Sequence, residues 1–453
     1  MSSRPGAVST TATAPRLLNR DFLLLWQGQL VSQVGNQAFL VAQMFWLMEA
    51  TGSATLMGLL LMSSSLPGIL LGPLAGTLAD RHSRKALIVL ADLARGVAVL
   101  ALAALLYARP DQTGAIVAML FGVGLWSGIF GAVFNPAITA AIPDLVPAAR
   151  LQAANSLHQL SRQGATFLGQ AVGGVAFRLL GAPLLFLVDG ASYVISAVSE
   201  AFIRLPGLER DRSAMPAGAS SPEGSDTPAR APRRQALRSY LTDTGEGMRY
   251  VWSWAGMRTF VLTATGVNFL FTPVFVLLPF YVTDVLQRRA DWYGFLLASM
   301  SLGSLAGLAV AGSVRLEGAH RARVLTAAFS GAAGLIAVLG VVRRPLVALV
   351  VVFAMGMFSA MINIFVLTLL QSSTPPEMRG RVMGLVLTLA GAATPLGMAT
   401  GGIAADLTGR HVPATYVTLG LLATALVVLA ATRVSFREFL AMDTARPIVR
   451  DPT

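Results

Sequence analysis

Cysteine is absent from the 453-residue chain, and charged residues are scarce. Without cysteine, neither a disulfide framework nor a thiolate metal site can form. The four histidines show no HExxH or similar paired spacing, so no metal ion or other cofactor is expected. No nucleophile–base set stands out either, and we do not expect an enzyme. Charged residues make up only 12%, about half the share usual in soluble proteins.

Hydrophobic residues make up 55% of the chain, and its mean hydropathy is +0.66. A single soluble core cannot bury so much apolar surface in a chain of this length. About 20 apolar residues span the roughly 30 Å of bilayer hydrocarbon. We therefore predict an all-α polytopic membrane protein with twelve transmembrane helices, near residues 22–48, 54–79, 86–107, 114–142, 152–178, 182–203, 259–284, 292–314, 323–342, 345–371, 381–405 and 413–432.

Basic residues are almost all arginine, with Lys85 the only lysine among 34. This bias indicates a GC-rich, bacterial genome. The net charge of +12 is compatible with nucleic-acid binding, yet most basic residues fall in alternate loops between the predicted helices. An excess of Lys and Arg marks the cytoplasmic loops of membrane proteins. We therefore expect no nucleic-acid partner, and we predict a cell-membrane protein with both termini in the cytoplasm.

A polar run divides the apolar segments six and six. It begins with a stretch rich in Pro, Gly and Ser, typical of a flexible linker, and ends at 245–257 in a pattern typical of an interfacial helix. The predicted organisation is a cytoplasmic N-terminal tail, a six-helix half, a linker with this helix, a second six-helix half and a cytoplasmic C-terminal tail, at residues 1–20, 21–204, 205–257, 258–433 and 434–453. The first of these lacks the pattern of a cleavable signal peptide.

The two halves repeat each other in sequence. At a constant offset of 228 positions, Gly128 falls on Gly356 and Asn135 falls on Asn363, and an offset of 236 aligns the second predicted helix with the eighth. An even number of helices separates the copies, so both insert in the same orientation. Parallel repeats predict a pseudo-twofold axis along the membrane normal and a substrate path between the halves. The predicted fold class is two parallel six-helix repeats around a central cavity.

The loop after the second predicted helix carries a ten-residue pattern. Residues 76–85 read GTLADRHSRK and resemble the signature G-x-L-x-D-R-x-G-R-K/R of the Major Facilitator Superfamily, with Ser83 in place of the usual glycine. The resemblance implies a latch that holds the halves in the outward-facing state, formed by Gly76, Asp80, Arg81, Arg84 and Lys85. Gly76 permits close helix approach, and Asp80 suits a basic partner or a helix N-terminus. The alternative is that the cations only anchor the topology.

Glycines cluster in the fifth and eleventh predicted helices. Residues 169–174 read GQAVGG and are similar to the G-P-x-x-G-G element that marks antiporters of this superfamily, with Gln170 in place of proline. The eleventh helix carries a looser copy. We expect close helix packing and a bend at Gly169, Gly173, Gly174, Gly397, Gly401 and Gly402. Packing without antiport is the alternative.

Nearly the whole chain resembles the drug-efflux branch of this superfamily, which includes macrolide and siderophore exporters. Two positions depart from that branch. Asn36 follows Gly35 where the branch often has aspartate, and residues 113–149 contain no arginine, which many drug:proton antiporters carry there. Both departures concern proton coupling, so the resemblance leaves the route of the proton open.

Amide side chains interrupt the apolar helices. Several amides of the first helix fall on one face at 3.6 residues per turn. Amides in contact with lipid would be costly. We therefore expect a substrate-binding surface toward the central cavity, formed by Gln33, Asn36, Gln37, Asn135, Asn268 and Asn363. Hydrogen bonding between helices without a substrate is the alternative for each.

Few carboxylates lie within the apolar segments. Asp92 and Arg95 are three residues apart and are expected to neutralise each other, and Glu200 and Arg204 are spaced as an ordinary helical ion pair. Asp189 has no basic neighbour along its own helix. Because intramembrane carboxyls of this kind serve as proton carriers, Asp189 is a candidate proton-coupling site, and the alternatives are a structural salt bridge and a role at the helix N-terminus.

These features predict a secondary active transporter that exports amphipathic small organic molecules, such as drugs, antibiotics or siderophores, by alternating access and proton antiport. The expected partners are the lipid bilayer, a small-molecule substrate and protons, and the oligomeric state is open. No Walker A sequence is present to support ATP drive by this chain. The alternatives are uptake or facilitated transport of a specific metabolite, and a non-transporting membrane sensor or scaffold.

Overall fold

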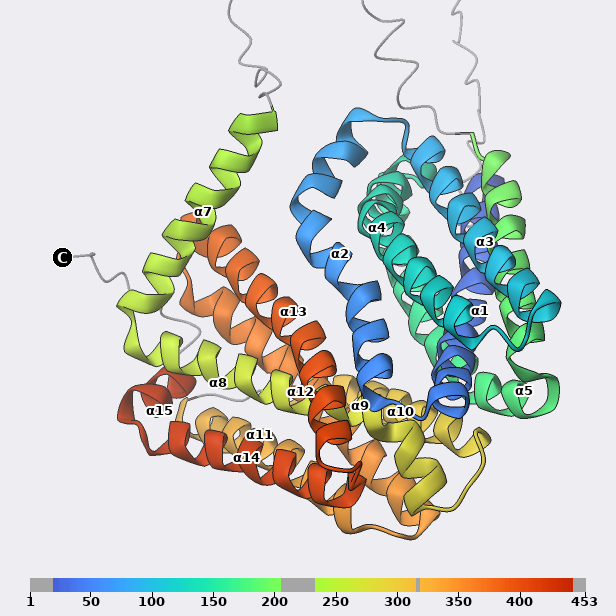
Figure 1. The fold of residues 1–453 in the computed structure, drawn as a ribbon. Helices are drawn as coiled ribbons and strands as arrows, with labels where there is room; N and C mark the ends of the chain where they lie inside the picture. Colours follow the sequence, from blue (N-terminus) through green and yellow to red (C-terminus); the bar gives the residue numbers. More distant parts are fainter. Residues whose placement is uncertain (1–18, 205–232, 315–317, 443–453) are drawn as a thin grey trace, which may run out of the picture.

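A computed structural model describes residues 19–204, 233–314 and 318–442, with side chains for all of these except 73–81, 233–241 and 243. The N-terminal half consists of α1 (Arg20–Thr51), α2 (Ala54–Arg81), α3 (Arg84–Ala108), α4 (Thr113–Leu145), a 3-10 turn (Ala148–Arg150) and α5 (Leu151–Ala201) (Figure 1). The C-terminal half consists of α7 (Arg233–Ser253), α8 (Ala255–Phe271), α9 (Pro273–Phe280), a π-helical turn (Tyr281–Val285), α10 (Asp291–Ser313), α11 (Gly318–Val341), α12 (Pro345–Ser373), α13 (Pro376–Leu407), α14 (Val412–Thr432) and α15 (Val434–Ala441).

The helix α5 has two arms that meet at Gly181. This residue has φ 74° and ψ 171°, a conformation that glycine adopts far more readily than other residues. The arms coincide with the separate helices predicted at 152–178 and 182–203. Both pack against α1: Gly173 of the first arm lies against Ala38, and Ser196 of the second arm lies against Gly28. The turn at Gly181 therefore lets one continuous segment cover two sides of α1.

Every predicted apolar segment coincides with helical chain to within a few residues. Over 259–284 the helix is divided into α8, α9 and the π-helical turn, because Pro273 and Pro279 cannot donate backbone hydrogen bonds. Ten stretches within the described ranges are long and apolar enough to span a membrane, and the amide-rich α1 is not among them. The all-helical membrane fold is thus confirmed, while the number of twelve crossings stays a prediction.

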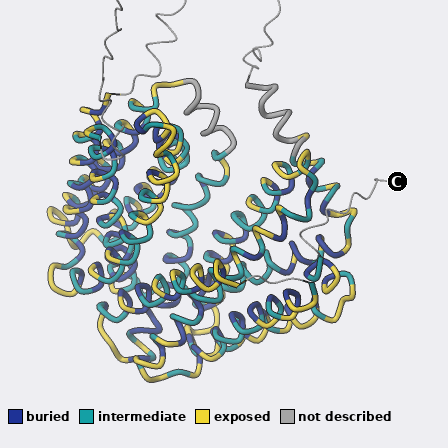
Figure 2. The backbone as a smooth tube through the Cα atoms, turned by 180° about the vertical axis from the view of Figure 1, so that it is seen from behind, coloured by how far each residue is buried: buried dark blue, intermediate teal, exposed yellow. Residues whose placement is uncertain are grey.

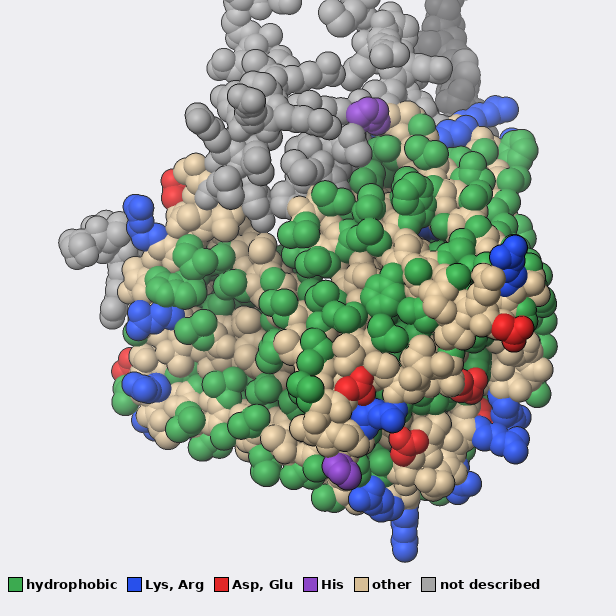
Figure 3. Space-filling view, viewed as in Figure 1, with side chains coloured by type: hydrophobic (Ala, Val, Ile, Leu, Met, Phe, Trp, Pro, Cys, Tyr) green, Lys and Arg blue, Asp and Glu red, His purple; other side chains and the backbone are tan. Residues whose placement is uncertain are grey.

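The outer faces of the helices are apolar. Large hydrophobic side chains are exposed along them, among them Leu179, Val350 and Leu407. Buried residues concentrate on the inward helix faces (Figure 2). On the face shown in Figure 3, apolar side chains cover the middle, and charged ones lie toward the lower end and along the edges. Soluble proteins rarely expose so much contiguous apolar surface, and contact with lipid explains it.

The internal duplication is visible in the packing. Gly128 of α4 lies against the carbonyl of Ser64 in α2, and Gly356 of α12 lies against the carbonyl of Met300 in α10. These are equivalent positions under the two sequence offsets, because Gly356 follows Gly128 by 228 positions and Met300 follows Ser64 by 236. The same helix pairs therefore make the same contact in each half, as parallel repeats require.

Two segments outside the predicted spans pack onto the C-terminal half. In the predicted linker, α7 contacts α8 and α13, and its Val251 is buried. In the predicted C-terminal tail, residues 434–441 form α15, whose Phe436, Phe439 and Leu440 are buried because their spacing places them on one helix face. The remaining parts of the predicted tails and linker, residues 1–18, 205–232 and 443–453, lie outside the described residues.

Candidate functional site

The two halves meet along two helix pairs, α2 with α13 and α5 with α10. Their ribbons approach each other at one end of the molecule and diverge toward the other (Figure 1). We call the end formed by residues 52–55, 178–183, 289–291 and 406–410 the closed end. The opposite end, where Asn19 donates to the carbonyl of Leu145, is called the open end.

Two glycines bring the halves into backbone contact at the closed end. Gly174 of α5 lies against Ala290 and Asp291, and a Cβ atom there would stand 2.7 Å from the Ala290 carbonyl oxygen. Gly402 of α13 lies against Ala54 in the same way. The pairs are equivalent under the two sequence offsets, so the closed end has the pseudo-twofold symmetry of the whole fold.

Replacing Gly174 by alanine should loosen the closed end. Overpacking a tight contact costs about 1–3 kcal/mol, which changes the ratio of closed to open molecules by roughly 5- to 150-fold. The measurement is the maleimide labelling rate of a cysteine introduced at the buried Ala290, in a chain that has no cysteine of its own. Gly164→Ala on the same helix is the matched control, since a Cβ there meets nothing within 4 Å. Equal labelling in both variants would contradict the contact.

The carboxylate of Asp406, the penultimate residue of α13, caps α2 of the other half. Its oxygens accept hydrogen bonds from Ser53 Oγ at 2.8 Å, from Thr55 N at 2.9 Å and from Ala54 N at 3.1 Å. An acidic side chain is favoured at a helix N-terminus, where backbone N–H groups lack partners. Arg410 adds a second link by donating to the carbonyl of Gly52. Sequence reasoning missed both residues, because no motif marks them.

The other helix pair carries an ion pair at the equivalent place. Arg178 of α5 contacts the Asp291 carboxylate of α10 at 2.9 Å. The two links occupy equivalent positions of the repeats, because Asp406 follows Arg178 by 228 positions and Asp291 follows Thr55 by 236. One pair therefore joins an acid to a helix N-terminus, and the other joins an arginine to an acid in the first turn of a helix. Each of these two contacts connects the N-terminal half to the C-terminal half.

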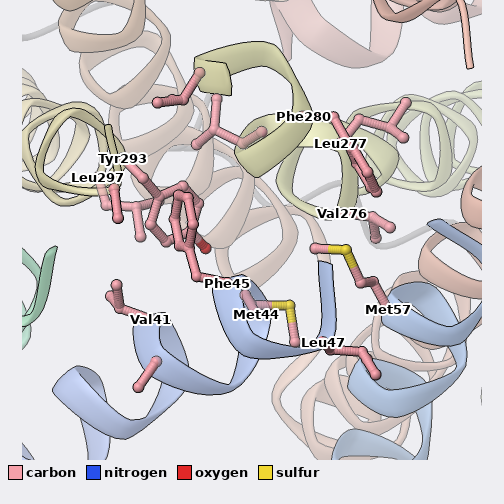
Figure 4. Packing of buried hydrophobic residues seen from close by; sticks show 14 of the residues in the cluster. Val41, Met44, Phe45, Leu47, Met57, Val276, Leu277, Phe280, Tyr293 and Leu297 are labelled. Atoms are coloured by element: carbon pink, nitrogen blue, oxygen red, sulfur yellow. The ribbon is translucent and has the colours of Figure 1, made fainter. Parts of the chain in front are cut away.

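Aromatic and aliphatic side chains fill the space between these polar links. Phe45 of α1 packs edge-on against Tyr293 of α10, with ring centroids 5.4 Å apart, and lies 5.5 Å from the ring of Phe177 (Figure 4). Met44 and Leu47 beside it are fully buried. This apolar packing joins the halves beside the polar links. A cavity of about 610 Å³, lined by Phe45, Phe177, Arg178 and Ala290 among others, lies next to it at the closed end.

The predicted amides of α1 lie on two kinds of surface. Gln33 is half-buried and Asn36 is exposed, and Gln33 lies on the side of α1 away from Gly35 and the second arm of α5. Gln37 accepts a hydrogen bond from Gln170 Nε2 at 3.3 Å, and Gln170 Oε1 accepts one from Ser301 of α10 at 3.0 Å. The residue that replaces the proline of the antiporter element thus links the two halves.

The remaining predicted amides differ in their surroundings. Asn135 of α4 and Asn363 of α12 are exposed at equivalent positions of the two repeats, and Asn135 donates to the carbonyl of Gly131 at 3.2 Å. Asn268 of α8 donates to the Ala390 carbonyl and to Thr394 Oγ1 of α13, each at 3.0 Å. Its amide N–H groups therefore hold two helices together.

The six predicted glycines all lie where helices approach closely. Gly174 and Gly402 contact the opposite half, as described above. The other four contact neighbours within their own half, at α1 and at the α8–α9 junction: Gly169 at Val34, Gly173 at Ala38, Gly397 at Phe269, and Gly401 at Pro273. Packing thus accounts for each of these positions.

The predicted latch lies only partly within the described side chains. Those of Gly76, Asp80 and Arg81 lie outside them. Arg84 forms an ion pair with Asp144 at 2.5 Å and donates to the Ala140 carbonyl at 2.9 Å, both at the end of α4 in its own half. Lys85 lines a narrow hole that also reaches Glu200.

Four charged residues are buried together inside the N-terminal half. Asp92 and Arg95 of α3 lie 3.9 Å apart, as expected. Glu200 is 1% exposed and, instead of turning toward Arg204 at the surface, accepts a hydrogen bond from Gln29 Nε2 at 2.7 Å. The same Gln29 nitrogen donates to Asp92 at 3.4 Å. A single amide of α1 therefore joins carboxylates from α3 and α5.

Asp189 is buried on the same arm of α5, about three helical turns before Glu200 and one turn before Tyr193, whose ring lies 5.8 Å from Arg95. It is 1% exposed, and neither of its carboxylate oxygens has a hydrogen-bond partner among the described residues. It lies against α1, where a Cβ atom on Gly35 would stand 2.9 Å from Asp189 Oδ1. Arg95, held between the rings of Phe134 and Tyr193 at 4.8 and 5.8 Å, is the basic group that acts on it. A buried carboxylate without a donor is costly and indicates a function.

Comparison with known proteins places these features in a family. The sequence profile of the Major Facilitator Superfamily matches residues 25–398. The multidrug efflux pump Tap of Mycolicibacterium fortuitum is 27% identical over 412 residues, which cover 88% of this chain and 92% of that protein. Macrolide efflux protein A of Streptococcus pyogenes is 26% identical over 403 residues, covering 86% and 90%.

Solved structures share the fold at low sequence identity. A bacterial homologue of the iron transporter ferroportin, in an inward-facing state, aligns with a TM-score of 0.67 at 15% identity and covers 92% of this chain and 100% of that one. The D-xylose–proton symporter aligns with a TM-score of 0.64 at 15% identity, covering 90% and 96%. The chain therefore belongs to the Major Facilitator Superfamily, whose members are membrane transporters and not enzymes.

Proposed function

We propose that this transporter exports amphipathic small organic molecules by alternating access, with proton entry as the driving force. The observation that carries the substrate class is the set of exposed neutral amides on three helices, Asn36 of α1, Asn135 of α4 and Asn363 of α12. Such groups donate and accept hydrogen bonds without demanding a fixed charge on the ligand. The relatives named for multidrug and macrolide efflux support the same class.

In this proposal the open end faces the cytoplasm. Arg84, Lys85 and Arg204 lie there, in loops that the distribution of basic residues assigns to the inside. The structure then corresponds to the state that takes up substrate from the cytoplasm or the inner leaflet. Export requires the closed end to separate and the open end to close, with the halves rocking about the substrate between them. Asp189 is the candidate residue for coupling this motion to protons.

A compound-accumulation panel tests the direction and the substrate class together. Cells that lack their own pumps are loaded with ethidium, a macrolide and a tetracycline, with and without the protein. We expect lower steady-state accumulation of at least one compound when the protein is present. Higher accumulation would indicate uptake. An unchanged level of every compound, together with no binding by the purified protein, would favour a sensor or scaffold.

The variant Asn36→Leu should weaken export without preventing membrane insertion. Loss of one hydrogen bond to a ligand is worth about 0.5–1.5 kcal/mol, or roughly a 2- to 12-fold change in affinity. We expect a comparable rise in the concentration of compound needed for half-maximal export. Gln27→Leu, at another exposed amide of α1, is the matched control. If both variants export like the parent protein, the amide surface does not bind substrate.

A further inference from the structure

The buried charges of the N-terminal half do not balance. Asp92, Asp189 and Glu200 supply three carboxylates, and within the described residues only Arg95 forms an ion pair with one of them, at 3.9 Å from Asp92. With every group ionised, the cluster would carry a net charge of −2 within the apolar part of the fold. Uncompensated charge in such a place is strongly unfavourable, and a carboxyl group avoids it by binding a proton.

The hydrogen bonds around the cluster are too few for three carboxylates. Asp92 and Glu200 share the one amide of Gln29, and Ser196 Oγ lies 3.4 Å from Glu200. Glu200 Oε2 and both oxygens of Asp189 have no donor within the part of the chain that the structure describes. The groups that face the cluster from neighbouring elements are the neutral ring of Phe134 from α4 and the phenol ring of Tyr193 from α5. Neither ring carries a positive charge. Lys85, at the start of α3, is a second cation near the cluster, because it lines the same narrow hole as Glu200, but no ion pair joins it to a carboxylate of the cluster among the described residues.

One member of the cluster, Glu200, lies beside a narrow hole near the open end. Glu200 lines a narrow hole of about 10 Å³ together with Lys85, Leu145 and Ile203, which lie where α3 begins and where α4 and α5 end. A hole of this size holds about one water molecule. At the other side of the cluster, Asp189 touches α1 at Gly35, directly before the exposed Asn36. The three carboxylates therefore extend from the narrow hole near the open end to α1 at Gly35.

We propose that Asp92, Asp189 and Glu200, around Arg95 and Gln29, form one proton-carrying site that holds two protons in the state described here. Glu200 exchanges protons with water at the open end, and Gln29 couples Glu200 to Asp92 through its two donated hydrogen bonds. Two O–H bonds form on carboxylate oxygens as the site loads, and the same bonds break when the protons leave. This inference rests on the proposed proton-coupled export and extends it from Asp189 to a cluster.

Infrared spectroscopy tests the protonation directly on the reconstituted, full-length protein. At neutral pH we expect the carbonyl absorption of protonated, buried carboxylic acids, and a loss of part of it in Glu200→Gln and in Asp189→Asn. The Gln side chain can still accept the bond from Gln29, so Glu200→Gln preserves the packing. Asp111→Asn, at an exposed site between α3 and α4, should leave the band unchanged. A parent protein without this band would overturn the proposal.

Transport in proteoliposomes separates this inference from the export function. With ethidium as the probe, we expect Glu200→Gln and Asp189→Asn to lose transport driven by a pH gradient but to retain exchange of ethidium for ethidium. If a pH gradient drives the parent protein and both variants equally, the cluster is not the coupling site. If the parent protein transports ethidium but ignores the pH gradient, proton antiport fails while export stands. The infrared band decides the protonation of the cluster in every case.

Discussion

Reversible cross-linking across the closed end should stop transport, and cleaving the cross-link should restore it. Met48 of α1 and Thr283 of the π-helical turn belong to different halves, and Thr283 Oγ1 lies 3.9 Å from Met48 Sδ. Cysteines at these two positions are within reach of a short bis-methanethiosulfonate reagent, whose disulfides a reductant cleaves. Because alternating access requires the halves to separate here, the bridged protein is expected to be trapped with its closed end shut.

The chain suits this experiment because it contains no cysteine. A second pair, Ser299→Cys with Leu349→Cys, joins α10 to α12 within one half, where Ser299 Oγ donates to the Leu349 carbonyl at 2.8 Å. Bridging that pair should leave transport largely intact, since each half moves as a unit. Undiminished transport by the protein bridged between Met48 and Thr283 would show that the halves do not separate at this end.

Asp80→Asn is expected to reduce export by roughly 2- to 30-fold while the protein still inserts in the membrane. The expected effect follows from how α2 and α13 meet at the closed end, opposite to Asp80. Asp406 is the penultimate residue of α13 and caps the start of α2, and Asp80 is the penultimate residue of α2, which runs antiparallel to α13. In the state with the open end shut, Asp80 is therefore placed to cap the start of α13. Asparagine can still accept the capping hydrogen bond, so the variant removes only the interaction of the negative charge with the helix N-terminus, worth roughly 0.3–2 kcal/mol.

Accumulation assays and spin-label distances check this prediction together. Asp80→Asn should favour the state described here, and Asp406→Asn should favour the opposite one, so the two variants are each other's controls. Spin labels on α2 and α13 at the open end should move apart in the first variant and together in the second. Normal export by Asp80→Asn would refute the latch, and equal shifts in both variants would refute the reciprocal arrangement.

Much of the fold can be predicted from local sequence patterns. The length of apolar segments located the helices because the bilayer imposes that length on any helix that crosses it. The offset that joins Gly128 to Gly356 revealed the repeat because glycine recurs where backbones touch, and a touching backbone tolerates no Cβ atom. The helix at Val434–Ala441, within the predicted C-terminal tail, was not predicted, because eight residues are too few for a helix to be recognised by periodicity.

The functional contacts were harder to foresee because they join residues far apart in the chain. Asp406 contacts Thr55 across 351 positions, and Glu200 reaches Gln29 across 171. Spacing alone paired Glu200 with Arg204, because a helix allows that contact, but burial turned the carboxylate inward. Asn268 shows the opposite outcome: the sequence predicts it in the cavity, yet its amide donates hydrogen bonds to Ala390 and Thr394 of α13.

By itself the sequence determined a helical membrane protein of two parallel repeats, with a family signature at residues 76–85, because apolar length, repeat offset and motif are all properties of local sequence. Only the tertiary structure decided which end of the halves is closed, that Asp406 and Arg178 join them there, and that Gln29 joins Asp92 to Glu200. The physical reason is that charge balance and helix capping depend on which groups meet in space. Neither can be evaluated from the separation of residues along the chain.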